Sequence, residues 1–319
     1  MRLPQEIFYA KLLLFGEYSV ICGSMALSVP FGHFKGELSF LGQEKYTDYD
    51  FAVSSNQQLK EYFNNLKENV ACHSVLDLKA FEKDLASGLF FESTIPQGYG
   101  LGSSGALTAA VYARYAFHRI PFTRNLSDEA IKNLRKTFSL LESFFHGTSS
   151  GFDPLSSYLK LPLLILPGNI IRITSVPRNR DYGKAGIFLL NTGLARKTQN
   201  LVENFLMQCK QDNAFGKMIS REYIPLTNLC IQSLIEGNVK NFTRHLKILS
   251  SYQLLHFHPM IPKGFGDVWE SGINRKLFYL KLCGAGGGGF LLGFAKNLDA
   301  ALNWLSERNF STVTVYRSH

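Results

Sequence analysis

The sequence predicts an α+β protein of two domains, and three observations support this fold class. The chain has 319 residues, enough for two domains of ordinary size. Hydrophobic residues make up 45% of it and charged residues 18%, a balance typical of globular rather than disordered or fibrous proteins. Strand-like and helix-like segments occur on both sides of a polar run, Pro177–Gly183, where we place the boundary. The expected domains are therefore residues 1–180 and 181–319.

The first domain is expected to begin in a sheet. The residues Glu6–Phe15 are apolar and β-prone, and Ala26–Phe40 is typical of further short strands. Apolar positions at helical spacing predict helices over Leu59–Val70 and Leu76–Leu85. The next β-prone segment, Leu89–Ile95, is expected to return the chain to the sheet.

Two helices and a strand are expected to complete the first domain. An alanine-rich composition favours a helix over Ser103–Phe117, with Ser103 as its N-cap. A second helix is expected over Ser127–Phe145, because Ser127 is followed by two acidic residues that interact favourably with the helix dipole. This helix should end near a glycine at position 147, and the strand-like stretch Leu163–Ile173 follows it.

The second domain is expected to contain a β-α-β-β-α-β unit. A strand over Gly186–Asn191 is followed by several helices and by two strands around Phe278–Phe294. The helix Leu298–Arg308 and the strand Thr312–Tyr316 complete the pattern. With the extra helices set aside, this order is that of a ferredoxin-like domain.

Composition argues against several classes of protein. Lys11 and Glu17 interrupt the strongest apolar run, which therefore falls short of the roughly 18 to 20 residues that cross a bilayer, and no secretory signal is recognisable. We expect a cytoplasmic protein without a membrane partner. Five scattered cysteines without C-x-x-C spacing favour reduced thiols. The net charge of +9 suits anionic ligands such as nucleotides, but no basic block indicates a nucleic-acid partner.

The segment Pro96–Gly105 has the composition of an anion-binding loop. Three alternate glycines precede two serines where a helix is expected to begin. Glycine lets the main chain approach a phosphate, and the N–H groups and dipole of a helix N-terminus favour negative charge. A glycine-rich turn with an ordinary serine cap is the alternative. The spacing is neither that of a P-loop nor that of a Rossmann fingerprint. The expected nucleotide ligands are Pro96, Gly98, Gly100, Leu101, Gly102, Ser103 and Ser104.

With two further segments, this loop resembles the galactokinase, homoserine kinase, mevalonate kinase and phosphomevalonate kinase (GHMP) superfamily. The loop is similar to its second motif, P-x-x-x-G-L-G-S-S. Lys11–Gly23 resembles the first motif and Cys283–Phe290 the glycine-rich third motif, in the family's order and approximate spacing. The resemblance covers nearly the whole chain. It implies an ATP-dependent kinase with a ribosomal-protein-S5-domain-2-like N-terminal domain and a ferredoxin-like C-terminal domain.

Within the superfamily, the segment His146–Asp153 resembles the H-G-x-x-S-G-x-D pattern of mevalonate kinases, and Glu142 precedes its aspartate by eleven residues. The resemblance implies that Glu142 and Ser104 hold Mg²⁺, that Asp153 accepts the proton of the substrate alcohol, and that Lys11 stabilises the developing charge. Taken alone, Glu142 can equally be a solvated charge on a helix, and Asp153 can equally be the N-cap of the next segment. Lys11 lies in an apolar strand, so a structural role would need a paired acid or a snorkelling stem.

The resemblance also implies a small-molecule alcohol as substrate, most closely mevalonate, in isoprenoid biosynthesis. The segment ending at Thr198 is similar to one that lies near the substrate in mevalonate kinases, although Thr198 can equally be an N-cap. Mevalonate kinases usually carry histidine where this chain has Tyr18, and both Tyr18 and Gly105 resemble phosphomevalonate kinases. Phosphomevalonate kinase, sugar kinase and a catalytically silent ligand sensor therefore remain alternatives, and a homodimer is left open. The expected substrate residues are Glu17, Tyr18, Thr198, Gly284, Ala285 and Gly286.

Overall fold

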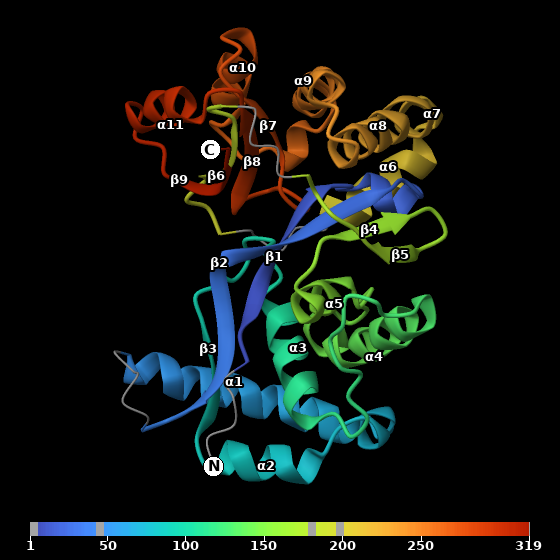
Figure 1. The fold of residues 1–319 in the computed structure, drawn as a ribbon, viewed down its shortest axis with the longest axis vertical. Helices are drawn as coiled ribbons and strands as arrows, with labels where there is room; N and C mark the ends of the chain where they lie inside the picture. The colour runs from blue at the N-terminus through green and yellow to red at the C-terminus, as the bar shows by residue number, and fades with distance from the viewer. Residues whose placement is uncertain (1–5, 43–47, 178–182, 196–200, 319) are drawn as a thin grey trace. The chain divides into compact units, whose positions relative to one another are not determined.

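Residues 6–42, 48–177, 183–195 and 201–318 are described by the computed structural model, which has the expected mixed α+β architecture (Figure 1). The chain forms two compact units that are interleaved in sequence. Unit 1 contains the chain up to Lys11, Pro30–Pro96 and Gly102–Leu161, and unit 2 contains Leu12–Val29, Gln97–Leu101 and the chain from Pro162 onward. The expected division after residue 180 stays a prediction, and residues 178–182 of the expected connection lie outside the described residues.

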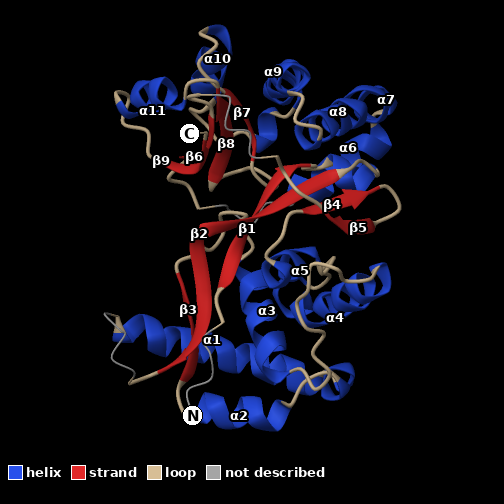
Figure 2. Ribbon diagram, in the orientation of Figure 1, coloured by secondary structure: helices blue, strands red, loops and turns tan. Residues whose placement is uncertain are grey.

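Two long strands contribute residues to both units. β1 (Phe8–Phe15) and β2 (Ala26–Phe40) are neighbours in a sheet whose order is β1-β2-β4-β5, and β3 (Leu89–Ser93) also pairs with β2 (Figure 2). The expected short strands over Ala26–Phe40 are one 15-residue strand. It remains continuous because its beginning pairs with β4 (Leu163–Leu166) and its end with β3. The sheet ends at β5 (Ile170–Ile173).

In unit 1, α3 packs against α5 and α4. Ser127 caps α4 as expected, since its hydroxyl accepts a hydrogen bond from the Ala130 amide (3.2 Å), and α4 ends at Gly147. The expected cap at Ser103 is wrong. The N-cap of α3 is Gly102, whose left-handed φ of 74° turns the chain into the helix, and no described side chain caps it. The helices are α1 (Tyr49–Glu68), α2 (Leu78–Ala86), α3 (Ser103–Tyr115), α4 (Asp128–His146) and α5 (Phe152–Leu159).

The helices α3 and α5 pack unusually closely, and α5 is too short to have been expected from the sequence. A Cβ atom on Gly105 of α3 would lie 2.7 Å from the carbonyl carbon of Asp153 in α5. At the N-cap of α5, a Cβ atom on Gly151 would lie 2.2 Å from the carbonyl oxygen of Arg135 in α4. Glycine at these two positions therefore lets three helix backbones meet around Asp153.

Unit 2 contains the expected β-α-β-β-α-β order. Its sheet has the order β7-β8-β6-β9, and every pair is antiparallel. This is the arrangement predicted for a ferredoxin-like domain, enlarged by helices between the first two strands. The strands are β6 (Gly186–Asn191), β7 (Tyr279–Leu282), β8 (Phe290–Ala295) and β9 (Thr312–Arg317). The helices are α6 (Leu201–Gln211), α7 (Asn213–Met218), α8 (Ile224–Ile235), α9 (Val239–His256), α10 (Gly266–Asn274) and α11 (Leu298–Ser306).

Among the described helices, none combines the length and the apolar character that crossing a membrane requires.

The packing of α3 against α5 predicts that Gly105→Ala destabilises the protein. Alanine suits a helix, but its methyl group would overlap the backbone at Asp153, and such overpacking costs about 1–3 kcal/mol. Gly266→Ala in α10 is the matched control, because no atom lies within 4 Å of its added Cβ, and we expect a gain of up to about 1 kcal/mol. Urea unfolding measures both changes. Equal effects of the two substitutions would contradict the packing argument.

Candidate active site

An ion pair lies beside the start of α3. Lys11 of β1 and Asp153 of α5 approach to 2.8 Å between Nζ and Oδ1. The lysine side chain is 9% exposed and the aspartate side chain 32% exposed, so the pair is sheltered but Asp153 remains accessible to a small molecule. A Cβ atom on Gly102 would lie 2.9 Å from Cγ of Lys11 and 3.5 Å from Oδ2 of Asp153. The N-terminal end of α3 therefore lies directly against this pair.

A second cluster joins α3 to α4 through the buried carboxylate of Glu142. The Ser104 hydroxyl donates to Oε1 of Glu142 at 3.2 Å, and the Ser149 hydroxyl donates to Oε2. Glu142 is 3% exposed. The structure thus brings together the two residues expected to hold a metal ion, Ser104 and Glu142, in the same unit as the Lys11–Asp153 pair.

The electrostatics of this cluster favour a neutral carboxyl group at Glu142. Burial raises its pKa from 4.5 to about 7, and the negative charge of Asp153 acts in the same direction. Hydrogen bonds from Ser149 and Ser104 and the positive charge of Lys11 oppose the rise. A cation placed beside Glu142 and Asp153 would stabilise the charged form of the buried Glu142 carboxylate. It would also reduce the repulsion between this carboxylate and Asp153.

The loop between α4 and α5 explains how residues eleven positions apart reach one site. The backbone carbonyl of Ser149 accepts a hydrogen bond from the hydroxyl of Ser139, and the carbonyl of Ser150 accepts one from Nε of Arg135 (2.9 Å). The Gly151 amide donates to the Ser149 hydroxyl at 3.0 Å. These bonds fold the loop back onto α4, so that α5 begins beside α4.

The phosphate-binding loop predicted from the sequence contributes to both units. Within unit 2, Gly98 and Gly100 have left-handed φ values of 77° and 74°, and Leu101 is buried. A Cβ atom on Gly100 would lie 3.4 Å from the carbonyl oxygen of Cys283 and 3.9 Å from Cα of Gly284. The glycine-rich third motif therefore packs against this loop. Within unit 1, Pro96 ends one segment, and Gly102, Ser103 and Ser104 begin α3.

The expected substrate residues Glu17 and Tyr18 face the interior of unit 2. Glu17 forms an ion pair with Lys281, and the two side chains are 1% and 0% exposed. Lys281 also donates to the carbonyl of Leu282 at 2.6 Å. Tyr18 is buried, and its hydroxyl donates to the carbonyl of Ala285. A contact between these two side chains and a substrate stays a prediction.

Two functional candidates lacked a clear signal in the sequence. Lys281 lies in the apolar strand β7, where it is buried. Its position among apolar residues is the signal that it needs an acidic partner. Ser149 lies within the segment that resembled the mevalonate kinases, but its bond to Glu142 depends on how the loop folds. Among the remaining expected substrate residues, Gly284 and Gly286 have left-handed backbones, while Thr198 lies outside the described residues.

The oxygen ligands in unit 1 fit a magnesium ion. Mg²⁺ prefers carboxylate and hydroxyl oxygens, keeps several waters and is completed by the phosphates of a nucleotide. Glu142 and Ser104 supply this kind of ligand, and their side chains are already hydrogen-bonded to each other. Among the described residues, no group of three histidine, cysteine, aspartate or glutamate side chains gathers into an all-protein metal site.

One family comparison agrees, over part of the chain, with the resemblance inferred from the three motifs. Residues 62–160 match the family model of the GHMP kinases N terminal domain. This segment includes the predicted phosphate-binding loop, Glu142 and Asp153. No match was found among curated protein sequences.

Several solved structures share the fold. L. major mevalonate kinase, solved with R-mevalonate, is 17% identical with a TM-score of 0.65, and the match covers 99% of this chain and 97% of that enzyme. Lactococcus lactis galactokinase, solved with galactose, is 11% identical with a TM-score of 0.63, covering 99% and 94%. Streptococcus pneumoniae phosphomevalonate kinase, solved with phosphomevalonate and AMPPNP, is 14% identical with a TM-score of 0.63, covering 98% and 100%. The matches support the expected two-domain α+β fold.

The raised pKa of Glu142 predicts a pH-dependent stability in the metal-free protein. In the folded state Glu142 keeps its proton up to about pH 7, whereas in the unfolded state it loses the proton near pH 4.5. The contribution of Glu142 to the free energy of unfolding is therefore fully present below pH 4.5 and is lost as the pH rises to about 7. The loss is at most about 3 kcal/mol. We expect Glu142→Gln to remove this part of the pH dependence in EDTA, as measured by urea unfolding. Glu61→Gln, at an exposed position on α1, is the control and should leave the pH dependence of stability unchanged. If Glu142→Gln also left this pH dependence unchanged, Glu142 would not be its source.

The buried pair in unit 2 predicts a large effect of Lys281→Met. Removing the lysine leaves the Glu17 carboxylate buried without its partner, which costs about 3–5 kcal/mol. The double variant Glu17→Gln/Lys281→Met should recover part of this loss, because it removes both charges. Lys67→Met is the control, since the Lys67–Glu82 pair is exposed and contributes at most about 1 kcal/mol. Similar losses for Lys281→Met and Lys67→Met in guanidinium unfolding would argue against the buried pair.

Proposed function

We propose that this chain, whose residues 62–160 match the family model of the GHMP kinases N terminal domain, transfers the γ-phosphate of ATP to the primary alcohol of mevalonate and yields 5-phosphomevalonate. The Lys11–Asp153 ion pair beside the start of α3 carries this proposal. It combines a carboxylate that can accept a proton with an ammonium group, at a helix end suited to phosphate.

In this proposal Asp153 acts as the base. Its partly exposed carboxylate accepts the proton of the substrate hydroxyl as that oxygen attacks the γ-phosphorus. The bond between the γ-phosphorus and the bridging oxygen breaks, and ADP leaves with the electron pair. Lys11 keeps the Asp153 carboxylate in place and stabilises the charge that develops on the transferred phosphoryl group. No covalent bond to the protein is required.

The loop Pro96–Ser104 is proposed to bind the phosphates of ATP. The first turn of α3 has no side-chain cap among the described residues, which suits main-chain N–H groups that bind an anion. Ser104 and Glu142 would hold Mg²⁺, which neutralises phosphate charge when bound. The Ser149 hydroxyl keeps the Glu142 carboxylate oriented toward α3.

Mevalonate is favoured as the acceptor by the segment His146–Asp153, whose pattern resembles mevalonate kinases. Phosphomevalonate is the second candidate, because Tyr18 stands where mevalonate kinases usually carry histidine. Gly105, the other departure, has a separate cause in the packing of α3 against α5. Tyr18 therefore remains the specific observation in favour of phosphomevalonate. We further propose a cytoplasmic location and a role in isoprenoid biosynthesis.

A panel of acceptors tests the proposal. ADP release in the presence of ATP and Mg²⁺ should be saturable with mevalonate and at least about tenfold less efficient, in kcat/KM, with phosphomevalonate or galactose. Turnover with phosphomevalonate or galactose alone would reassign the substrate. The absence of turnover with every acceptor would contradict the kinase proposal.

The role of Asp153 is tested with Asp153→Asn. The amide cannot accept the proton, so we expect kcat to fall by about 10²–10⁴-fold in a variant that remains folded. Asp128→Asn, at an exposed position in α4, is the matched control and should keep wild-type kcat. Circular dichroism confirms that both variants fold. Wild-type kcat in Asp153→Asn would remove this residue as the base.

A further inference from the structure

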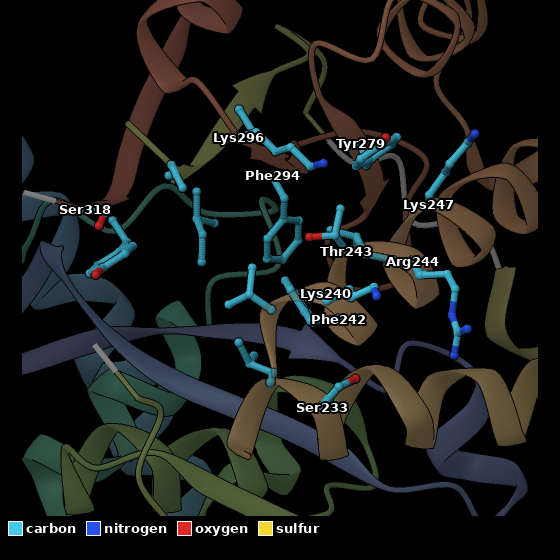
Figure 3. A pocket seen from close by; sticks show the side chains of 18 of the residues that line it. Ser233, Lys240, Phe242, Thr243, Arg244, Lys247, Tyr279, Phe294, Lys296 and Ser318 are labelled. Carbon is cyan, nitrogen blue, oxygen red and sulfur yellow. The ribbon is translucent and has the colours of Figure 1, made fainter. Parts of the chain in front are cut away.

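Unit 2 contains a cavity that the proposed kinase reaction does not use. It has a volume of about 860 Å³ and lies between one face of the β7-β8-β6-β9 sheet, the end of α8 and the beginning of α9 (Figure 3). Its volume falls within the range of small-molecule sites, about 300–1,000 Å³. None of the residues predicted for catalysis, nucleotide binding, metal binding or substrate binding lines it.

One row of side chains across the sheet forms the floor of this cavity. Tyr279 of β7 lies opposite Phe294 of β8, Phe294 opposite Ile187 of β6, and Ile187 opposite Tyr316 of β9. Residues directly opposite one another in antiparallel strands point to the same face. All four line the cavity, so its floor is a continuous apolar surface with phenol groups at both ends.

One face of α9 covers this floor. Val239, Phe242, Thr243 and Leu246 line the cavity, and their spacing of three and four residues places them on one side of the helix. The Phe242 ring packs edge-on against Phe294, at 5.7 Å between centroids, and closes one wall. Val239 and Phe242 are only half-buried, so the cavity retains accessible apolar surface.

Four cations surround the apolar interior. Lys240, Arg244 and Lys247 project from α9, and Lys296 follows β8; all four line the cavity and are exposed. None of them forms an ion pair with a described residue. Among the described lining residues there is no acidic side chain. Figure 3 shows Lys240, Thr243 and Lys296 around the Phe294 ring, and Arg244 and Lys247 farther along α9.

We propose that this cavity binds an amphipathic anion, a molecule with an aliphatic body and a carboxylate or phosphate head group. The apolar floor and the face of α9 would enclose the body. The head group would lie among Lys240 and Lys296, with the Thr243 hydroxyl as a hydrogen-bond donor. A small polar anion leaves the apolar surface exposed, and an uncharged aliphatic molecule leaves four like charges without a partner, so neither matches both features.

Isothermal titration calorimetry with the full chain tests this proposal. Dodecyl phosphate and dodecanoate, below their micelle concentrations, distinguish a phosphate head from a carboxylate head, and saturable one-to-one binding of either supports the site. Dodecanol and inorganic phosphate should each bind at least about tenfold more weakly, because each lacks one of the two matching parts. The proposal would be overturned if dodecanol bound as tightly as the anions, or if neither anion showed saturable binding.

Two variants locate the binding. Lys240→Glu/Lys296→Glu reverses two exposed charges at the cavity and should weaken dodecyl phosphate at least about tenfold. Lys217→Glu/Lys263→Glu changes the net charge equally at exposed positions that do not line the cavity, and should stay within about twofold of wild type. An equal loss in both double variants would indicate a non-specific charge effect and overturn the site.

Two further measurements separate this cavity from the proposed nucleotide site. Thr243→Trp places a large side chain in the cavity and should abolish binding of dodecyl phosphate, with folding checked by circular dichroism. Saturating ATP should leave the affinity for dodecyl phosphate unchanged. Displacement of dodecyl phosphate by ATP, or retained binding in a folded Thr243→Trp variant, would contradict the assignment to this cavity. Because these readouts are binding affinities, they are independent of kinase turnover.

Discussion

The close approach of the start of α3 to the backbone at Asp153 is the constraint on which the candidate active site depends. A side chain at Gly102 would meet the Lys11 side chain, and one at Gly105 would meet the Asp153 backbone. Without Cβ atoms at these positions, the positive end of the helix, an ammonium group and a carboxylate occupy one small region. The same two glycines therefore determine both the packing of α3 against α5 and the chemistry available there.

Burial decides what each ion pair can do. Lys11 and Asp153 pair with about a third of the aspartate side chain exposed, so the carboxylate can hold its partner and still meet another molecule. Glu17 and Lys281 pair where neither side chain reaches solvent. A buried ion pair of this kind can orient the groups around it. The two pairs contain the same functional groups, but the pair in unit 1 is the more accessible of the two.

Glu142 links the helices to the proposed metal chemistry. Burial and the nearby negative charge of Asp153 raise its pKa to about 7, against the opposing effect of the two serine hydroxyls that donate to it. The loop that folds back onto α4 maintains this arrangement, because Ser149 bonds to Glu142 while its own backbone is fixed by Ser139. A buried carboxylate of this kind gains more from a divalent cation than an exposed one would.

The sequence by itself determined the elements with strong local causes. The start of α4 was predictable because the Ser127 hydroxyl caps the helix through a local hydrogen bond that does not depend on tertiary packing. The strand over Gly186–Asn191 was predictable from its β-prone residues. Through the family resemblance, the motifs also indicated Ser104 and Glu142 as joint metal ligands and Lys11 and Asp153 as catalytic residues. Only the tertiary structure decided that Lys11 pairs with Asp153, that Glu17 is buried against Lys281 and that Gly102 replaces Ser103 as the cap. These outcomes depend on contacts between residues distant in sequence, and neither propensity nor spacing contains the burial and charge that such contacts create.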